Sequence, residues 1–161
     1  MEKINLEEEA RSRRVAKSLA ANIEFLNRNE DDGRDEEFLL KLAKGLVVVF
    51  LVSGDEIFRE GEPGDDMYFV KKGTVDILVN DMTVATINAG KFFGEVSLIA
   101  NIPRTATAKA TSTCMLYRLS RATFTKILDE FEDMRERIKR IYEERLAKVS
   151  LEKLNRSLTT K

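Results

Sequence analysis

One segment of the chain, residues 93–108, combines side chains that could recognise a small polar ligand. It contains Gly94, the carboxylate of Glu95 and the guanidinium of Arg104 among small and apolar residues. A carboxylate and a guanidinium in such surroundings need partners, because an unpaired buried charge is costly. The two side chains could pair with each other. They could instead face a ligand that carries both an anion and hydroxyl groups, since a guanidinium can bind two phosphate oxygens and a carboxylate accepts from a hydroxyl.

Composition limits the chemistry that this segment could perform. The chain has 161 residues and a formal net charge of -1, which favours one ordinary domain with an appendage and gives no reason to expect a nucleic acid partner. It has no histidine and a single cysteine, Cys114. A zinc site, a Cys/His dyad or a metal-dependent enzyme is therefore not expected. The lone cysteine cannot form an internal disulfide, which favours a reducing compartment.

The two ends of the chain have helical spacing. Apolar residues recur every three to four positions over 6–28, and a second helix is predicted over 35–44, with Asp35 as its cap. Helical spacing returns over 120–156, where Ser120 is the expected cap. These segments are expected to flank the central part of the chain.

The centre, residues 46–119, is dense in turn signals and contains short alternating segments. This pattern is typical of an antiparallel roll or barrel. The fold class is therefore predicted to be α+β: an antiparallel, jelly-roll-like β-roll with N-terminal helices and a long C-terminal helix. The expected strands are 67–70, 74–79, 83–87, 105–110 and 114–119.

One position breaks the apolar stripe of the last helix. Residue 145, where the stripe should continue, is an arginine flanked by Leu146 and Val149. From periodicity alone, the simpler explanation is a long side chain whose charged end reaches water at the rim of the core. The alternative is that this face closes over a ligand, with Arg145 stacking on an aromatic base or bonding to it.

The segment 93–108 resembles the phosphate-binding cassette of cyclic-nucleotide-binding domains. The matching motifs are Phe93-Gly94-Glu95, Ser97-Leu98 and Pro103-Arg104-Thr105-Ala106-Thr107. An upstream block resembles the turn-rich entry to the family's roll, in Gly54-Asp55-Glu56-Ile57, the run from Glu60 to Val70, and Gly73. The resemblance covers roughly residues 38–154. It implies a domain over 31–161 that binds cAMP or cGMP as a ligand, with no cofactor, no metal and no catalysis.

The resemblance also implies roles for the residues of the cassette. Arg104 would bind the cyclic phosphate, Glu95 would accept from the ribose 2′-hydroxyl, and Gly94 would bring backbone close to the ligand. Arg145, aligned with a residue of the family's lid helix, would cap the purine. The other predicted ligand-binding residues are Phe93, Val96, Ser97, Thr105, Ala106, Ile77, Ala85, Ile87, Leu146 and Val149.

Each assignment has a plain structural alternative. Arg104 could be salt-bridged to Glu95 or to another carboxylate, and Gly94 could be an ordinary turn glycine. Ile77, Ala85 and Ile87, which would form an apolar wall under the base, could instead be ordinary core packing. Val149 stands near the place where cGMP-selective family members carry an acidic residue, so we expect cAMP to bind at least as well as cGMP.

The parent protein is predicted from two weaker features. Residues 9–28 are similar to the last linker helices of cyclic-nucleotide-gated and hyperpolarisation-activated channels, and Thr105 matches the channel branch of the family. They predict a helical linker remnant over 1–30 in a domain excised from a potassium or cation channel, at the cytoplasmic face of the membrane. The partners would be the transmembrane pore domain and, in the full tetramer, the other subunits, while the fragment could be a monomer.

The alternative is a regulatory domain of a soluble cAMP-responsive kinase subunit or transcription regulator. A kinase subunit needs a second roll and an inhibitory segment, and a transcription factor needs a helix-turn-helix. None of these is expected within the 161 residues, but truncation could hide them, so both readings stay open as alternatives. No secretory leader is visible, and the longest apolar run, 45–52, is too short to span a bilayer.

Overall fold

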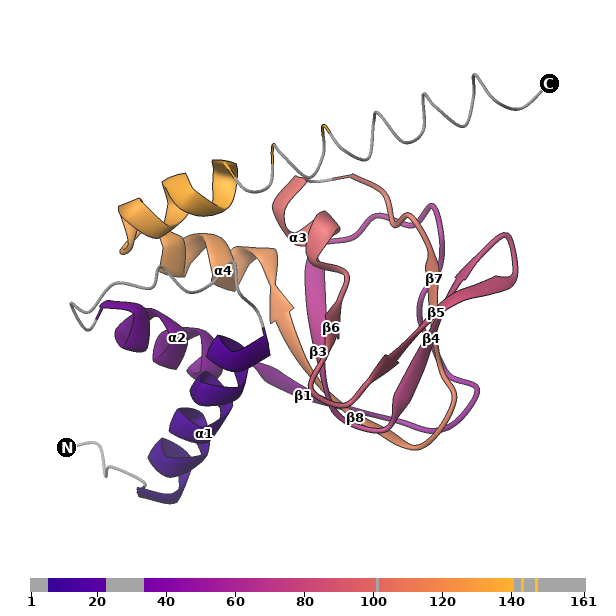
Figure 1. Ribbon diagram of the computed structural model, residues 1–161, viewed down its shortest axis with the longest axis horizontal. Helices are drawn as coiled ribbons and strands as arrows, with labels where there is room; N and C mark the ends of the chain where they lie inside the picture. Colours follow the sequence, from indigo (N-terminus) through magenta and orange to yellow (C-terminus); the bar gives the residue numbers. More distant parts are fainter. Residues whose placement is uncertain (1–5, 23–33, 101, 141–142, 144–146, 148–161) are drawn as a thin grey trace.

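Two four-stranded antiparallel sheets lie beside a group of helices in the computed structural model, which describes residues 6–22, 34–100, 102–140, 143 and 147 (Figure 1). In order across the first sheet, the strands are β1 (Val47–Leu51), β8 (Cys114–Ser120), β3 (Asp66–Lys72) and β6 (Phe92–Phe93). In the second sheet they are β2 (Glu56–Phe58), β7 (Thr107–Ala110), β4 (Thr74–Val79) and β5 (Met82–Asn88).

The two sheets enclose one hydrophobic core. Val70 on β3 faces Leu116 on β8 across the strand pair, and both are completely buried, as is Val75 on β4 of the other sheet. Side chains alternate between the two faces of a strand, so Phe69, the residue before Val70, points to the opposite side of the sheet. The first sheet is therefore buried on both faces, while β5 is a largely exposed edge strand.

The outer face of the first sheet is covered by α1 (Leu6–Asn22), α2 (Arg34–Lys44), α4 (Arg121–Leu128) and the helical residues 132–140. A further short helix is α3 (Glu95–Ala100). A second core forms where Leu42 of α2 and Met134, both fully buried, pack in one cluster with Phe69 and Leu119 of the sheet. Figure 1 shows α3 apart from this group, next to β3 and β6.

The α+β class and the antiparallel roll predicted from the sequence are confirmed, with local differences. The second helix begins at Arg34, one residue before its expected cap. Ser120 does cap α4, accepting from the N–H of Thr123 at 3.2 Å. The strand predicted from Thr105 starts only at Thr107, because residues 105–106 lie in a bend. Strands β1, β2 and β6 are not among the expected strands. β2 and β6 have too few residues for alternation to show, and β1 lies in a continuous apolar run without alternation.

The predicted lid falls largely outside the described residues. The helical segment predicted over 120–156 is interrupted at residues 129–131, after α4, and helix resumes over 132–140. Arg145, Leu146 and Val149 all lie outside the described residues, so their roles stay predictions. Among the residues described, none of the helices has the length and apolar character needed to cross a membrane.

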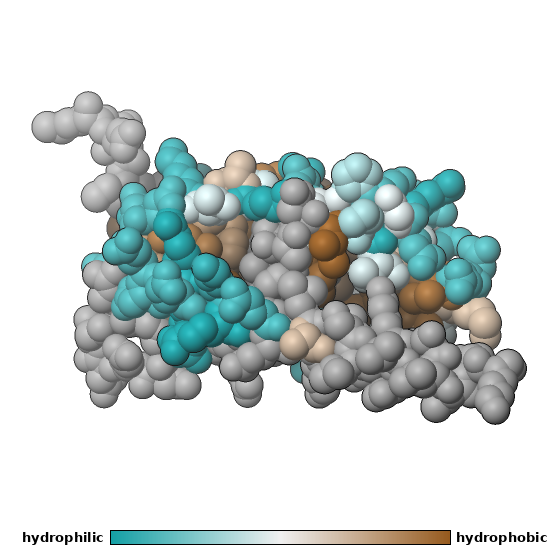
Figure 2. Space-filling model, turned by 90° about the horizontal axis from the view of Figure 1, so that it is seen from above, coloured by the Kyte–Doolittle hydropathy of each residue, from teal (hydrophilic) through white to brown (hydrophobic). Residues whose placement is uncertain are grey.

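The surface seen from above in Figure 2 is mostly hydrophilic, with hydrophobic residues in small separate patches. Small apolar patches are ordinary on a protein surface. Among the described residues, the exposed large apolar side chains include Phe50 on β1 and Met82 on β5. Both strands lie at the edge of a sheet. A groove of about 480 Å³ lies between α1 and the β1–β8 pair, far in the sequence from the cassette and lined in part by Val15, Val48 and Tyr117.

Candidate functional site

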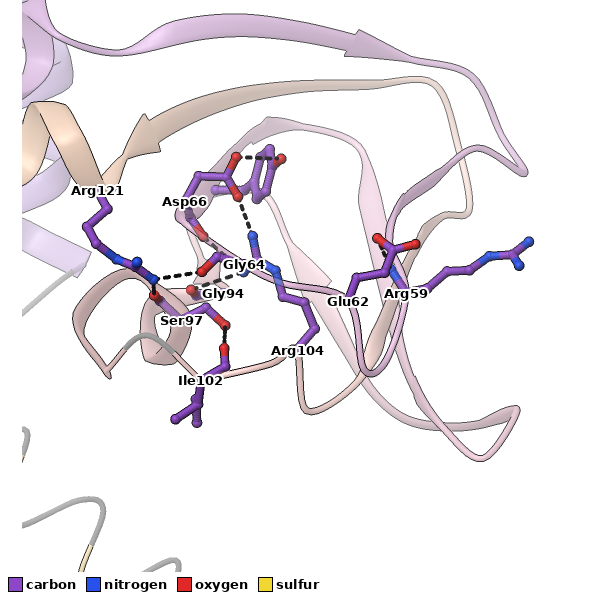
Figure 3. Close-up of polar contacts among 10 residues, drawn as sticks. Arg59, Glu62, Gly64, Asp66, Gly94, Ser97, Ile102, Arg104 and Arg121 are labelled. Carbon is purple, nitrogen blue, oxygen red and sulfur yellow. Dashed lines mark hydrogen bonds and ion pairs between the residues drawn. The ribbon is translucent and has the colours of Figure 1, made fainter.

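Arg104 lies in the connection between α3 and β7, and its backbone is fixed on the loop that joins β2 to β3. Its N–H donates to the carbonyl of Glu62 at 2.8 Å, and its own carbonyl accepts from the N–H of Gly61 at 2.8 Å. These two bonds hold two segments together that are about forty positions apart in the sequence. The guanidinium is thereby directed to the start of β3 (Figure 3).

The guanidinium of Arg104 is almost completely enclosed, with 5% of the residue exposed. Nη1 donates to the backbone carbonyls of Asp66 at 2.9 Å and Gly94 at 3.4 Å. Nη2 forms an ion pair with the carboxylate of Asp66. Asp66 is therefore the carboxylate that the structure shows paired with Arg104, where the sequence had suggested Glu95 or another carboxylate. A buried charge needs such a partner, and Asp66 supplies it.

One donor of the guanidinium has no partner. Within the part of the chain that the structure describes, the Nε of Arg104 is buried and makes no hydrogen bond. A buried donor without an acceptor is unfavourable, and each such group in a folded protein calls for an explanation. An anionic oxygen of a ligand would satisfy this donor.

Two glycines make room for the guanidinium. A Cβ at Gly64 would lie 2.4 Å from Nε of Arg104, and one at Gly94 would lie 2.9 Å from Nη1. Gly94 also has a φ of +81°, a conformation that side chains disfavour. Gly94 therefore brings its backbone close to Arg104, while the predicted approach of this backbone to a ligand stays a prediction.

The rest of the predicted cassette surrounds this arginine. Glu95 opens α3 and is half-buried, as is Val96. Phe93 on β6 is buried and stacked on Tyr68, with ring centroids 5.4 Å apart. Along the other segment, Thr105 is exposed and Ala106 is half-buried.

Ser97 is buried, and its polar groups are engaged within the protein. Its hydroxyl donates to the carbonyl of Ile102 at 3.3 Å. Its own carbonyl accepts from Nη2 of Arg121, which also donates to the carbonyl of Gly64 at 2.7 Å. Arg121 therefore ties the first turn of α4 to α3 and to the loop beside Arg104.

The three residues predicted to lie under the base share one face of the second sheet. Ile77 of β4 is paired with Ala85 of β5, and Val75 is paired with Ile87. Because Val75 is part of the core, this face is the one turned toward the other sheet. Ile77 and Ile87 are half-buried, whereas Ala85 is exposed. Ile77 and Ile87 pack against the core between the sheets. Contact of these three residues with a ligand stays a prediction.

Tyr68 completes the polar surroundings of the arginine. Its hydroxyl donates to the carboxylate of Asp66 at 3.3 Å. Burial and, after it, the negative charge of Asp66 raise the pKa of Tyr68 to about 12, although the positive charge of Arg104 partly opposes them. The phenol is therefore a neutral donor at physiological pH, which suits a role in orienting Asp66.

Asp66, Gly64 and Arg121 were not predicted from the sequence as residues of the site. The first two belong to the upstream block of the resemblance, but that block indicated only a turn-rich entry to the roll. No group of three or more potential metal-ligating side chains is found among the described residues.

Comparison with known protein families identifies the family of this chain. The chain belongs to the cyclic nucleotide-binding domain family, whose profile matches residues 48–131. The ligand of that family is a cyclic nucleotide, as predicted from the cassette.

Two similar relatives are cAMP-dependent protein kinase regulatory subunits. The one from Eremothecium gossypii is 48% identical over 75 residues, covering 47% of this chain and 16% of the relative. The one from Blastocladiella emersonii is 34% identical over 143 residues, covering 86% of this chain and 33% of the relative. The chain therefore spans a third or less of the curated relatives it matches.

A similar solved structure is the regulatory domain of Toxoplasma gondii PKA with cAMP. It has a TM-score of 0.62 and 27% sequence identity, and the match covers 78% of this chain and 46% of that chain. The similarity supports the fold described above. Neither these relatives nor this structure is a channel, so the predicted channel class finds no support in them.

Proposed function

We propose that this chain is a regulatory module that binds cAMP, and also cGMP, through Arg104. The single observation that carries the proposal is the buried guanidinium of Arg104 with its unpartnered Nε. Asp66 neutralises one edge of the guanidinium, and a cyclic phosphate would supply an acceptor for the other. Contact with the phosphate requires the segment around Gly64, which covers Nε, to move aside.

The neighbouring residues support the same ligand. Glu95 is placed at the start of α3, close in sequence to Gly94, whose carbonyl accepts from Arg104. A carboxylate there would repel a phosphate but accept from the ribose 2′-hydroxyl. The base would lie toward the face of Ile77, Ala85 and Ile87.

Ligand binding would reach the C-terminal helices through Arg121. This side chain bonds to the carbonyls of Ser97 in α3 and Gly64 beside Arg104, so a shift of either segment alters its contacts. The predicted lid with Arg145, Leu146 and Val149 would follow α4 and close over the base. Ligand can drive that closure only by binding the closed form more tightly.

Among effectors, a kinase catalytic subunit is the better candidate partner. Similarity to two cAMP-dependent protein kinase regulatory subunits favours this assignment over a transmembrane pore domain. The channel assignment rests on Thr105 and on the helical pattern near the N-terminus alone. Fluorescence anisotropy of a labelled kinase catalytic subunit, with and without cAMP, tests the partner. Binding that cAMP weakens supports it, and absence of any complex contradicts it.

Calorimetric titration of the chain with cAMP, cGMP and 5′-AMP tests the ligand. We expect saturable binding of both cyclic nucleotides, with cAMP at least as tight as cGMP, and much weaker binding of the non-cyclic 5′-AMP. We also expect no bond to be broken, so cAMP should be recovered unchanged by chromatography after prolonged incubation. Absence of heat and of thermal stabilisation at millimolar cAMP would refute the proposal.

A further inference from the structure

The guanidinium of Arg104 rests on an aromatic ring. Its central carbon lies 4.0 Å from the centroid of the Phe58 ring, close enough for a cation–π interaction. The site already described accounts for the edge of the guanidinium, which bonds to Asp66 and Gly94. The contact with Phe58 places the central carbon of the guanidinium over the ring and is a separate constraint.

Phe58 is held in place by two further rings. Its centroid lies 6.1 Å from that of Tyr68 and 5.9 Å from that of Phe93, and Tyr68 and Phe93 are stacked on each other. Aromatic pairs at these separations stabilise each other beyond the area they bury. Because Tyr68 also bonds to Asp66, the same cluster contacts both members of the Arg104–Asp66 pair.

A strand irregularity sets the position of Phe58. The β2–β7 pairing shifts register between Glu56 and Phe58, which places Phe58 opposite Ala108. Such an irregularity redirects a side chain relative to regular alternation. Ala108 is completely buried and small, so it leaves space for the ring between the sheets.

We propose that Phe58 is a positioning residue for cyclic nucleotide binding, acting through the face of its ring on the guanidinium of Arg104. This inference rests on the proposed function, in which Arg104 binds the phosphate. A long arginine side chain has many rotamers, and binding is weakened when they must be ordered on contact with the ligand. The ring holds the guanidinium in one position before the ligand arrives. An aliphatic side chain would fill the same space without attracting the cation.

A series of fluorinated phenylalanines at position 58 tests the inference, because fluorine withdraws electrons from the ring with little change in its shape. The full chain would carry phenylalanine, 4-fluoro-, 3,5-difluoro- or 3,4,5-trifluorophenylalanine there, and cAMP affinity would be measured by calorimetry. We expect the affinity to fall step by step along the series, with Phe58→Leu weaker by about tenfold and Phe58→Tyr close to the unmodified chain.

Phe69 provides the matched control. It is a buried phenylalanine on β3, in the core on the opposite side of the sheet from Phe58. Phe69→Leu and the same fluorinated residues at 69 should change thermal stability without a graded change in cAMP affinity. Thermal unfolding of each variant without ligand identifies any that fail to fold.

The outcomes separate this inference from the proposed function. If the unmodified chain binds no cyclic nucleotide, the proposed function fails. If it binds cAMP but the affinity is the same along the fluorinated series at 58, Phe58 is only a packing residue and the inference is overturned.

Discussion

Gly64 and Arg104 are in such close contact that a single methyl group cannot be added between them. A Cβ at Gly64 would lie 2.4 Å from Nε and 2.7 Å from the central carbon of the guanidinium. Gly64 is buried and does not have the left-handed conformation that favours glycine. The position therefore needs a glycine because there is no space for a side chain, not because of its backbone geometry. The loop between β2 and β3 thus sets where the guanidinium can lie.

We therefore predict that Gly64→Ala weakens cAMP binding by about tenfold or more, because the guanidinium must leave the position in which it meets the phosphate. Calorimetry measures the effect. Gly45→Ala is the matched control, since a Cβ there would also be crowded, at 2.7 Å from Thr123, but at the end of α2. Equal losses of affinity in the two variants would contradict the prediction.

Asp66 should matter for stability as well as for orientation. The side chains of Arg104 and Asp66 are 4% and 17% exposed, so Asp66→Asn would leave an enclosed guanidinium without its countercharge. We expect the free energy of unfolding to fall by about 3 kcal/mol in a urea titration.

The control for this pair is Glu130→Gln, which breaks the half-exposed ion pair with Lys41. Exposed pairs contribute less than about 1 kcal/mol, so this variant should be close to the unmodified chain. An Asp66→Asn variant as stable as the control would mean that Asp66 does not hold the buried charge.

Because the pKa of Tyr68 is raised, we predict that the protein loses stability at high pH. Its pKa is raised to about 12 by burial and by Asp66, against an ordinary value of 10.0. The folded state retains the phenol proton to a higher pH than the unfolded state does. The stabilisation of the folded state by the neutral phenol is therefore fully present below about pH 10 and is lost as the pH rises to about 12. The unfolding free energy of the native chain should therefore decrease more steeply over that range than that of Tyr68→Phe. Parallel curves would contradict the assignment.

The lid prediction concerns residues outside those described. If Arg145 stacks on the base, Arg145→Ala should weaken cAMP binding by about three- to thirtyfold while circular dichroism shows the roll still folded. Arg145→Lys retains the charge but not the planar group, so it should restore little of the affinity. Unchanged affinity in both variants would mean that Arg145 only extends from the rim of the core into water.

The cassette could be recognised from sequence because its residues are nearly contiguous, in two short motifs that include Glu95 and Arg104. The partner of Arg104 could not. Asp66 stands 38 positions earlier, in a turn-rich stretch with several other carboxylates, and nothing in their spacing distinguishes one from another. Only the pairing of Arg104 with the β2–β3 loop brings Asp66 into contact.

Other features depend on tertiary structure in the same way. Phe58 ends a strand of three residues, and the irregular pairing of that strand sets the direction of its ring. The parent protein was predicted from Thr105 and an amphipathic pattern near the N-terminus. Thr105 is one exposed side chain, and many helices share that pattern, so these features discriminate poorly between effectors.

The most direct test of the account is the affinity of the chain for cAMP before and after loss of one guanidinium. Calorimetry on the native chain and on Arg104→Ala should show saturable binding that becomes at least about thirtyfold weaker, since the phosphate loses its charged partner. Arg104→Lys should fall between the two. Equal affinity of the native chain and Arg104→Ala would show that the phosphate is bound elsewhere, and would contradict the account.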